Sequence, residues 1–214
     1  MLPTFRFAPS PNGRLHLGHA YSALLNASLA ERLSGRFLVR LEDIDTTRCT
    51  AELAEACLAD LRWLGLTWEE PVRVQSQHWS DYQAAFETLK ARGLVYPCFC
   101  SRKEIAHSSD AHDPDGAPIY AGTCRHVPHT EVQARMEAGE PHAWRLDMQR
   151  ALAEVKPPYT YRQFEVKDFQ TTTRSAQPQR WGDVVLVRKE IPTSYHLSVV
   201  VDDALQNITH VVRG

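Results

Sequence analysis

The chain has 214 residues, of which 43% are hydrophobic and 23% charged, and its net charge is −2 at pH 7. This composition is typical of a soluble globular protein and argues against a polybasic nucleic-acid binder, although it leaves room for a local basic groove. No apolar run approaches a membrane span and no signal peptide precedes residue 10, so we expect a cytoplasmic protein with no membrane partner. Five cysteines in that compartment argue against a disulfide framework.

The first predicted elements form a β-α-β unit. Residues 4–8 alternate and contain two phenylalanines, which predicts a strand, and apolar residues at helical spacing predict a helix over 17–34. Gly35 ends this helix, and residues 37–41 predict a second strand. Such a unit is almost always right-handed and parallel, and its ligands bind at the carboxyl ends of the strands.

The later elements are less regular. Helices are predicted over 51–64 and 81–92, the second capped by Ser80. From residue 96 to about 181 the periodicity weakens and three cysteines occur, which predicts an insertion with its own small fold. Further strands are predicted at 184–188, 197–201 and 208–212, the second because five consecutive residues read as a buried parallel strand.

The turn after the first predicted strand carries the strongest functional signal. The stretch 6–19 reads RFAPSPNGRLHLGH, with two histidines in an H-x-G-H pattern at the start of the helix. A helix N-terminus is a ready phosphate site, Gly18 permits close approach of a nucleotide, and His16 and His19 can donate hydrogen bonds to phosphoryl oxygens. The pattern predicts an enzyme that handles ATP phosphates. The alternative is that one histidine only caps the helix.

A second signal comes from sulfur. Cys98 and Cys100 can direct two thiolates at one ion, and Cys124 supplies a third. Because zinc prefers four tetrahedral sulfur or imidazole ligands, the pattern predicts a structural zinc site. On chemistry alone the fourth ligand stays open among four histidines, His107, His112, His126 and His129. The alternative is three unrelated buried thiols.

Four ordered blocks together resemble a known family. The turn at 6–19, LVRLEDID at 38–45, VVVDD at 199–203 and ITHVVRG at 208–214 look like the catalytic domain of class I glutamyl-tRNA synthetases. Within that family, YPCFC at 96–100 with IYAGTCR at 119–125 resembles the glutamyl-queuosine tRNA(Asp) synthetases. These short paralogues attach glutamate to the modified base queuosine in the anticodon of tRNA(Asp).

The resemblance implies an α/β fold, a Rossmann-like parallel sheet with an inserted zinc-bearing subdomain of the acceptor-binding type. It divides the chain into the first half of the catalytic domain (1–95), the zinc-containing insertion (96–181) and the second half of the catalytic domain (182–214). It implies Tyr120 as the fourth zinc ligand, beside Cys98, Cys100 and Cys124. We also expect a monomer.

The resemblance also implies the substrate-binding residues. Arginine binds carboxylates bidentately and would reject the neutral amide of glutamine, a carboxylate such as Glu42 can take the α-ammonium, and hydroxyls can donate hydrogen bonds. The positions implied for glutamate are Arg6, Phe7, Ala8, Pro9, Ser10, Glu42, Tyr195 and Arg213, and those implied for ATP are His16, Gly18 and His19. For an arginine taken alone, an ion pair or a surface role is the commoner explanation.

The expected activity is that of a ligase. ATP, supplied with Mg²⁺, would activate L-glutamate to glutamyl-adenylate, and the glutamyl group would pass to queuosine in tRNA(Asp). The Lys-x-Ser-Lys loop that such enzymes carry after the Arg-Gly pair is not found in this sequence, so we expect weak or absent activation by these residues alone. The alternatives are part of an ordinary glutamyl-tRNA synthetase charging tRNA(Glu), and a catalytically silent module that binds tRNA or zinc. Asp202 and Asp203 are given no role in magnesium binding.

Overall fold

The structure is a computed structural model that describes residues 2–107, 109 and 111–212. The chain forms two compact units: unit 1 contains residues 1–82 and 198–214, and unit 2 contains residues 83–197. The boundaries at 95/96 and 181/182 both fall within unit 2, and the three-part domain division remains a prediction. No helix among the described residues is long and apolar enough to cross a membrane.

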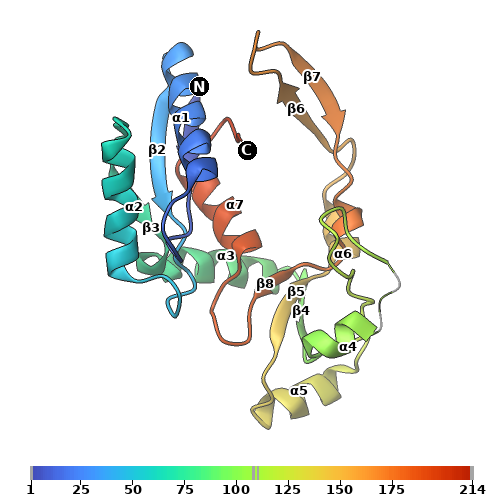
Figure 1. Cartoon of the computed structure of the whole chain (residues 1–214). Helices are drawn as coiled ribbons and strands as arrows, with labels where there is room; N and C mark the ends of the chain where they lie inside the picture. The colour runs from blue at the N-terminus through green and yellow to red at the C-terminus, as the bar shows by residue number, and fades with distance from the viewer. Residues whose placement is uncertain (1, 108, 110, 213–214) are drawn as a thin grey trace. The chain divides into compact units, whose positions relative to one another are not determined.

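Unit 1 is built on a parallel sheet of three strands in the order β1-β2-β3. The strands are β1 (Thr4–Phe7), β2 (Arg36–Leu41) and β3 (Glu69–Val74). Helix α1 (Leu17–Arg32) connects β1 to β2 and contacts both, and α2 (Ala51–Trp63) connects β2 to β3 (Figure 1). The predicted β-α-β unit and the α/β fold class are therefore confirmed, and β3 was not predicted.

The sheet is held by buried apolar side chains and one tight turn. Phe5 is 0% exposed and Val39 is 1% exposed, so the apolar residues from which β1 and β2 were predicted are buried. At the turn into β2, the Arg36 N–H donates to the Pro3 carbonyl at 2.7 Å. A Cβ on Gly35 would lie 2.4 Å from that same oxygen, so only glycine fits there.

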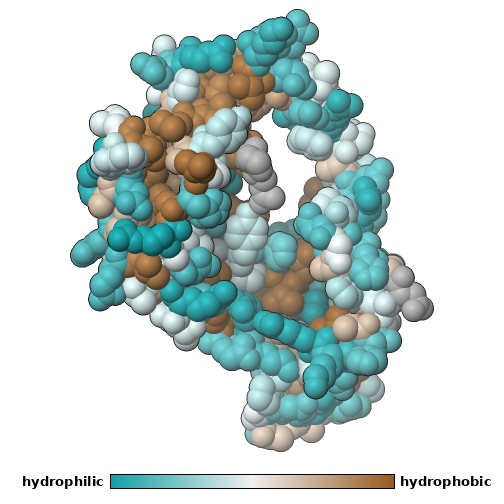
Figure 2. All heavy atoms as spheres, viewed as in Figure 1, coloured by the Kyte–Doolittle hydropathy of each residue, from teal (hydrophilic) through white to brown (hydrophobic). Residues whose placement is uncertain are grey.

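Unit 2 contains two separate small sheets. The strands β4 (Val95–Cys98), β5 (Ala143–Leu146) and β8 (Val185–Val187) form an antiparallel sheet in the order β4-β5-β8. The strands β6 (Thr160–Phe164) and β7 (Thr171–Ser175) form a two-stranded ribbon that is mostly hydrophilic (Figures 1 and 2). The helices α4 (Arg102–His107), α5 (His129–Glu137) and α6 (Met148–Glu154) complete the unit, with a 3-10 turn at Pro178–Trp181.

Two helices contain residues of both units. Helix α3 (Trp79–Ala91) begins two residues before the predicted start, so Ser80 lies inside the helix and is not its cap. Helix α7 (Tyr195–Leu205) contains the segment 197–201, and the prediction of a strand there is wrong. Leu197, Ser198 and Asp202 are buried on one face of α7, while Val200 is 65% exposed. This burial follows the period of a helix, which the run of valines in the sequence obscures.

Of the two remaining strand predictions, the one at 184–188 is confirmed and the one at 208–212 is wrong. The segment 184–188 contains β8, but β8 pairs antiparallel with β5 in unit 2 and does not extend the parallel sheet. Residues 208–212 form no named strand, and only His210 makes an isolated parallel bridge, to Phe5 of β1. The aromatic ring of Phe5 and the His210 imidazole stack there at 4.6 Å.

Candidate functional site

The loop that follows β1 is joined to the end of β2. The Glu42 N–H donates to the Pro9 carbonyl at 2.9 Å, so the turn after β1 and the acidic pair after β2 meet at the carboxyl edge of the sheet. Asp43 accepts from the backbone N–H and the hydroxyl of Ser76, at 2.8 and 2.6 Å, which ties in the segment after β3 as well. Ser10 is exposed, with its hydroxyl 3.6 Å from the Cys49 sulfur. This edge therefore gathers most of the residues that sequence analysis implicated in glutamate binding.

Arg6 and Glu42 are linked through an ion-pair network. The Arg6 guanidinium pairs with Asp203 at 3.2 Å, and Asp203 also accepts from Arg40 at 2.8 Å. Arg40 in turn donates to Glu42 at 3.1 Å and to Gln206 at 3.0 Å. Because each charge already has an oppositely charged neighbour, the site is held in place before any ligand binds.

Asp202 anchors the same network from its buried side. Its carboxylate is 0% exposed and accepts from Arg73 at 2.6 Å, from Gln75 at 2.7 Å and from the Tyr82 hydroxyl at 3.1 Å. The Arg40 Nε lies 3.7 Å from the same carboxylate. Asp202 and Asp203 thus position arginines of all three strands.

Burial shifts the ionisation of Glu42. Desolvation raises the pKa of the Glu42 carboxyl above its usual value, against the opposing attraction of Arg40 and Arg6. Desolvation works against the charge of Arg40 too, but Glu42 and Asp203 prevail and raise its pKa. Burial therefore makes the charge of Glu42 easier to lose on acidification than that of an ordinary glutamate.

The two histidines cap α1 in a reciprocal arrangement. His16 is the N-cap residue, and its Nδ1 accepts from the Gly18 N–H at 3.1 Å, while the His19 Nδ1 accepts from the His16 N–H at 3.3 Å. The rings stack with centroids 3.9 Å apart. Since both Nδ1 atoms are acceptors, each ring in its neutral form carries its proton on Nε2. Desolvation and the neighbouring His16 lower the pKa of His19, which favours this neutral form.

Gly18 is constrained by the same cap. A Cβ at Gly18 would lie 3.0 Å from Cε1 and 3.2 Å from Nδ1 of His16. Any side chain at this position therefore presses on the ring that caps the helix. The capping bonds use only the Nδ1 atom of each ring, so capping would not by itself prevent the predicted role in phosphate binding.

Two further residues implicated in glutamate binding lie in unit 2 or outside the described residues. Tyr195 is the first residue of α7 and belongs to unit 2, where it lines a cleft of about 640 Å³ together with Cys100, Tyr120 and Arg145. Arg213 lies outside the described residues.

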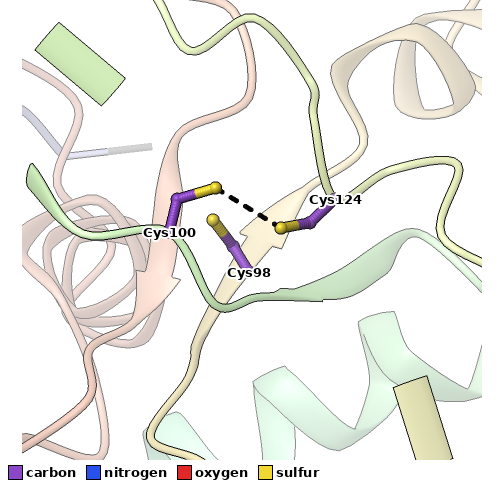
Figure 3. Close-up of side chains that lie close together, drawn as sticks. All are labelled: Cys98, Cys100 and Cys124. Atoms are coloured by element: carbon purple, nitrogen blue, oxygen red, sulfur yellow. Dashed lines mark hydrogen bonds between the residues drawn. The ribbon is translucent and has the colours of Figure 1, made fainter. Parts of the chain in front are cut away.

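Three thiols converge in unit 2 (Figure 3). Cys98 ends β4, Cys100 follows it and Cys124 precedes α5, and their sulfur atoms all lie within 4.8 Å of one another. The sulfurs of Cys100 and Cys124 are 3.5 Å apart, too far for a disulfide. Zn–S bonds of about 2.3 Å at tetrahedral angles place sulfurs roughly 3.8 Å apart, so the donor set fits zinc.

The Tyr120 hydroxyl lies against this thiol cluster. Its oxygen accepts from the Cys124 N–H at 2.8 Å and is 3.5 Å from the Cys100 sulfur. The potential metal ligands that group together among the described residues are the three cysteines, and the histidines considered as alternatives (His107, His112, His126 and His129) are not among them. Burial raises the pKa of the Cys100 thiol to about 11, so without a bound metal this thiol is protonated at neutral pH. The geometry favours Tyr120 over those histidines.

Residues 4–214 match the family model of class I tRNA synthetases (E and Q), catalytic domain. The chain belongs to this family. The expectation of a ligase is confirmed at the level of the family, because the relatives are named as synthetases and ligases.

Relatives of two kinds are found in the family. The glutamyl-Q tRNA(Asp) synthetases of Rhodobacter capsulatus and Nocardia farcinica are 42% and 44% identical, over 98% of this chain and 75% and 62% of their own lengths. A glutamate–tRNA ligase 2 of Nitrosococcus oceani is 40% identical over 98% of this chain and 44% of its own length. The predicted resemblance to the queuosine paralogues is thereby confirmed.

A solved structure agrees with these relatives. The crystal structure of a glutamate tRNA ligase from Elizabethkingia meningosepticum in complex with its amino acid matches with a TM-score of 0.74 and 25% identity, over 100% of this chain and 44% of that one. The 214-residue chain thus spans between 44% and 75% of the lengths of these relatives.

Sequence reasoning missed the residues that hold the site together. Arg40, Arg73, Gln75 and Tyr82 were given no role, yet they bind the Asp202–Asp203 pair. One signal was available for Arg40, since it is the sole charged residue within the apolar run 37–41. A charge in a buried strand needs a buried partner, and two adjacent aspartates occur later in the chain.

Proposed function

We propose that the protein activates L-glutamate with ATP and transfers it to queuosine in tRNA(Asp). In the first step an oxygen of the glutamate α-carboxylate bonds to the α-phosphorus of ATP, the bond from that phosphorus to the bridging oxygen breaks, and pyrophosphate leaves. In the second step a hydroxyl of queuosine attacks the activated carbonyl carbon and AMP leaves. The observation that carries the proposal is the linkage of Arg6, Asp203, Arg40 and Glu42 at the carboxyl edge of the sheet, beside the loop after β1.

The proposed division of labour follows from charge. Arg6, with Arg213, binds a carboxylate of glutamate; Glu42 binds the ammonium; Ser10 and Tyr195 donate hydrogen bonds; and the backbone at Phe7, Ala8 and Pro9 lines the pocket. His16 and His19 donate Nε2–H bonds to phosphate oxygens at the start of α1, and Gly18 allows the adenine to approach. Reactions of this type depend on positioning and on stabilisation of charge, which a pre-formed network provides. Mg²⁺ accompanies ATP as part of the substrate.

For the metal, we propose a structural zinc bound by Cys98, Cys100, Tyr120 and Cys124. Such a site would hold together a small region that has few buried apolar residues of its own. Elemental analysis of the purified protein is expected to find about one zinc per chain, and Cys98→Ala is expected to lose it. Unchanged zinc content in that variant would show that the ligand set is wrong.

The acceptor is the finer part of the proposal. It is supported by the names of the Rhodobacter and Nocardia relatives, whereas the Nitrosococcus relative favours charging of tRNA(Glu) as the second candidate. Glutamate-dependent ATP–pyrophosphate exchange by the full-length protein without tRNA is expected for the queuosine enzyme, and no exchange would count against it. Mass spectrometry of tRNA(Asp) from cells with and without the gene would then show whether glutamyl-queuosine depends on the protein.

A silent binding module is the remaining alternative. Calorimetric titration of the full-length protein with a non-hydrolysable glutamyl-adenylate mimic separates it from an enzyme, since a silent module need not bind the mimic. A cytoplasmic location and a monomeric state remain predictions.

A further inference from the structure

Arg145 is a buried arginine beside the thiol cluster. It lies in the middle of β5, opposite Tyr96 of β4 and Val185 of β8, and it is 8% exposed. Its guanidinium carbon lies 4.0 Å from the centroid of the Tyr120 ring. Its Nη1 donates to the Asp183 carbonyl at 2.7 Å, which helps to hold the guanidinium over the ring.

This buried cation has no carboxylate partner within residues 2–107, 109 and 111–212. The carboxylate of Asp183 pairs instead with Arg125, and the buried Arg145 Nε has no hydrogen-bond partner among the described atoms. Burying a charge without a counter-charge is expensive, and a native core rarely keeps one without a reason. We therefore expect an anion close to Tyr120 that balances the charge of Arg145.

The proposed zinc site would supply that anion. Three thiolates around one Zn²⁺ leave a net negative charge before the Tyr120 oxygen is counted, so the filled site is anionic in either form of the hydroxyl. Other cations near the cluster are less suited to balance it. Arg125 follows Cys124 but is paired with Asp183. Arg135 stacks on Phe99 at 4.0 Å and is engaged by Glu140 at 2.5 Å, and Lys189 is exposed and donates to the Phe99 carbonyl at 3.0 Å.

We propose that Arg145 is a positioning residue of the metal site, which holds the Tyr120 ring against the three thiols and balances the charge of the bound ion. This rests on the zinc site proposed above. Stacking of a guanidinium on a ring face both orients the ring and draws the cation toward the ligand oxygen. Partners of metal ligands typically change metal affinity about 10- to 100-fold when they are removed.

The test compares zinc affinity in Arg145→Gln, Arg145→Lys and a matched control, Arg174→Gln. Arg174 lies on the exposed β6–β7 ribbon of the same unit, so its loss removes the same charge without touching the cluster. Affinity is measured by competition with a chromogenic chelator, and the Co²⁺-substituted proteins report the thiolate ligands through their charge-transfer bands. Thermal unfolding with and without zinc gives the gain in Tm on metal binding.

We expect Arg145→Gln to bind zinc about 10- to 100-fold more weakly, with its thiolate bands retained, and Arg145→Lys to lie between it and wild type. The Tm gain on zinc binding should shrink in parallel, because stabilisation follows affinity. An affinity within about threefold of the control overturns the proposal, as does a loss of stability that is equal in the metal-free and zinc-bound forms, which marks a merely structural arginine. If wild type itself binds no zinc tightly, the zinc site is what fails.

Discussion

Replacing Asp202 with asparagine should destabilise the protein strongly. One carboxylate oxygen accepts from Arg73 and the other from Gln75, and the Tyr82 hydroxyl lies 3.1 Å from both. An asparagine NH₂ in either orientation would therefore face a donor, and the arginines around it would lose a fully buried counter-charge. Breaking a buried pair by removing one partner costs about 3–5 kcal/mol.

Urea unfolding followed by far-UV circular dichroism measures this loss. With a slope of about 2 kcal/mol per molar urea, the midpoint should fall by roughly 1.5–2.5 M. The control is Asp60→Asn, which removes the same charge from an exposed pair with Arg14 at 3.9 Å and should cost about 0.5 kcal/mol or less. If the two variants unfold within about 0.3 M of each other, the buried network contributes little and the reasoning fails.

Three further predictions concern the turns and the site. Gly35→Ala should lose about 2 kcal/mol or more of stability, because its Cβ would meet the Pro3 oxygen at 2.4 Å, whereas Gly13→Ala, with nothing within 4 Å, should leave the urea midpoint unchanged. Gly18→Ala should slow pyrophosphate exchange by the protein about 10-fold or more, because its Cβ displaces the His16 ring. Glutamate affinity, measured by calorimetry, should fall on acidification at a higher pH than a carboxyl of ordinary pKa would give, because burial raises the pKa of Glu42 and only its ionised form attracts the ammonium.

Each of these has a result that would contradict it. Equal midpoints for the Gly35 and Gly13 variants would mean that the turn adjusts without cost. Unchanged exchange in Gly18→Ala would remove the His16 ring from the proposed phosphate site. A Glu42→Gln variant that keeps the affinity and pH profile of wild type would show that Glu42 does not bind the ammonium.

The first part of the fold was predictable because its signals are local. Helix α1 ends at Arg32, and Ser34, not Gly35, takes the left-handed conformation after it, but the apolar spacing of the helix and of the two flanking strands was enough to indicate the β-α-β unit. The segment 197–201 misled because β-branched residues favour strands, while its helical state is set by the burial of Ser198 and Asp202 on one face. Strand β3 was missed because Pro71 and three charged residues interrupt the apolar pattern of a strand.

The candidate site was only half visible in the sequence. Residues with recognisable chemistry, such as Arg6, Glu42 and the three cysteines, could be picked out by motif and spacing. Their supports could not, because Arg40 and Asp203 are 163 positions apart and nothing local announces that they meet. The same holds for Arg145 and Tyr120, which become neighbours only through the pairing of β5 with the strands beside it.

The dependence of Arg40 on Asp202 and Asp203 has a consequence for synthesis on the ribosome. The three parallel strands are complete once residue 74 has been translated, but two of the three acids that pair with the buried Arg40 are residues 202 and 203. Until those residues leave the exit tunnel, the nascent sheet holds a guanidinium that water must keep solvated. All of unit 2 is synthesised in the meantime, so unit 1 is the first unit to be started and the last to be completed.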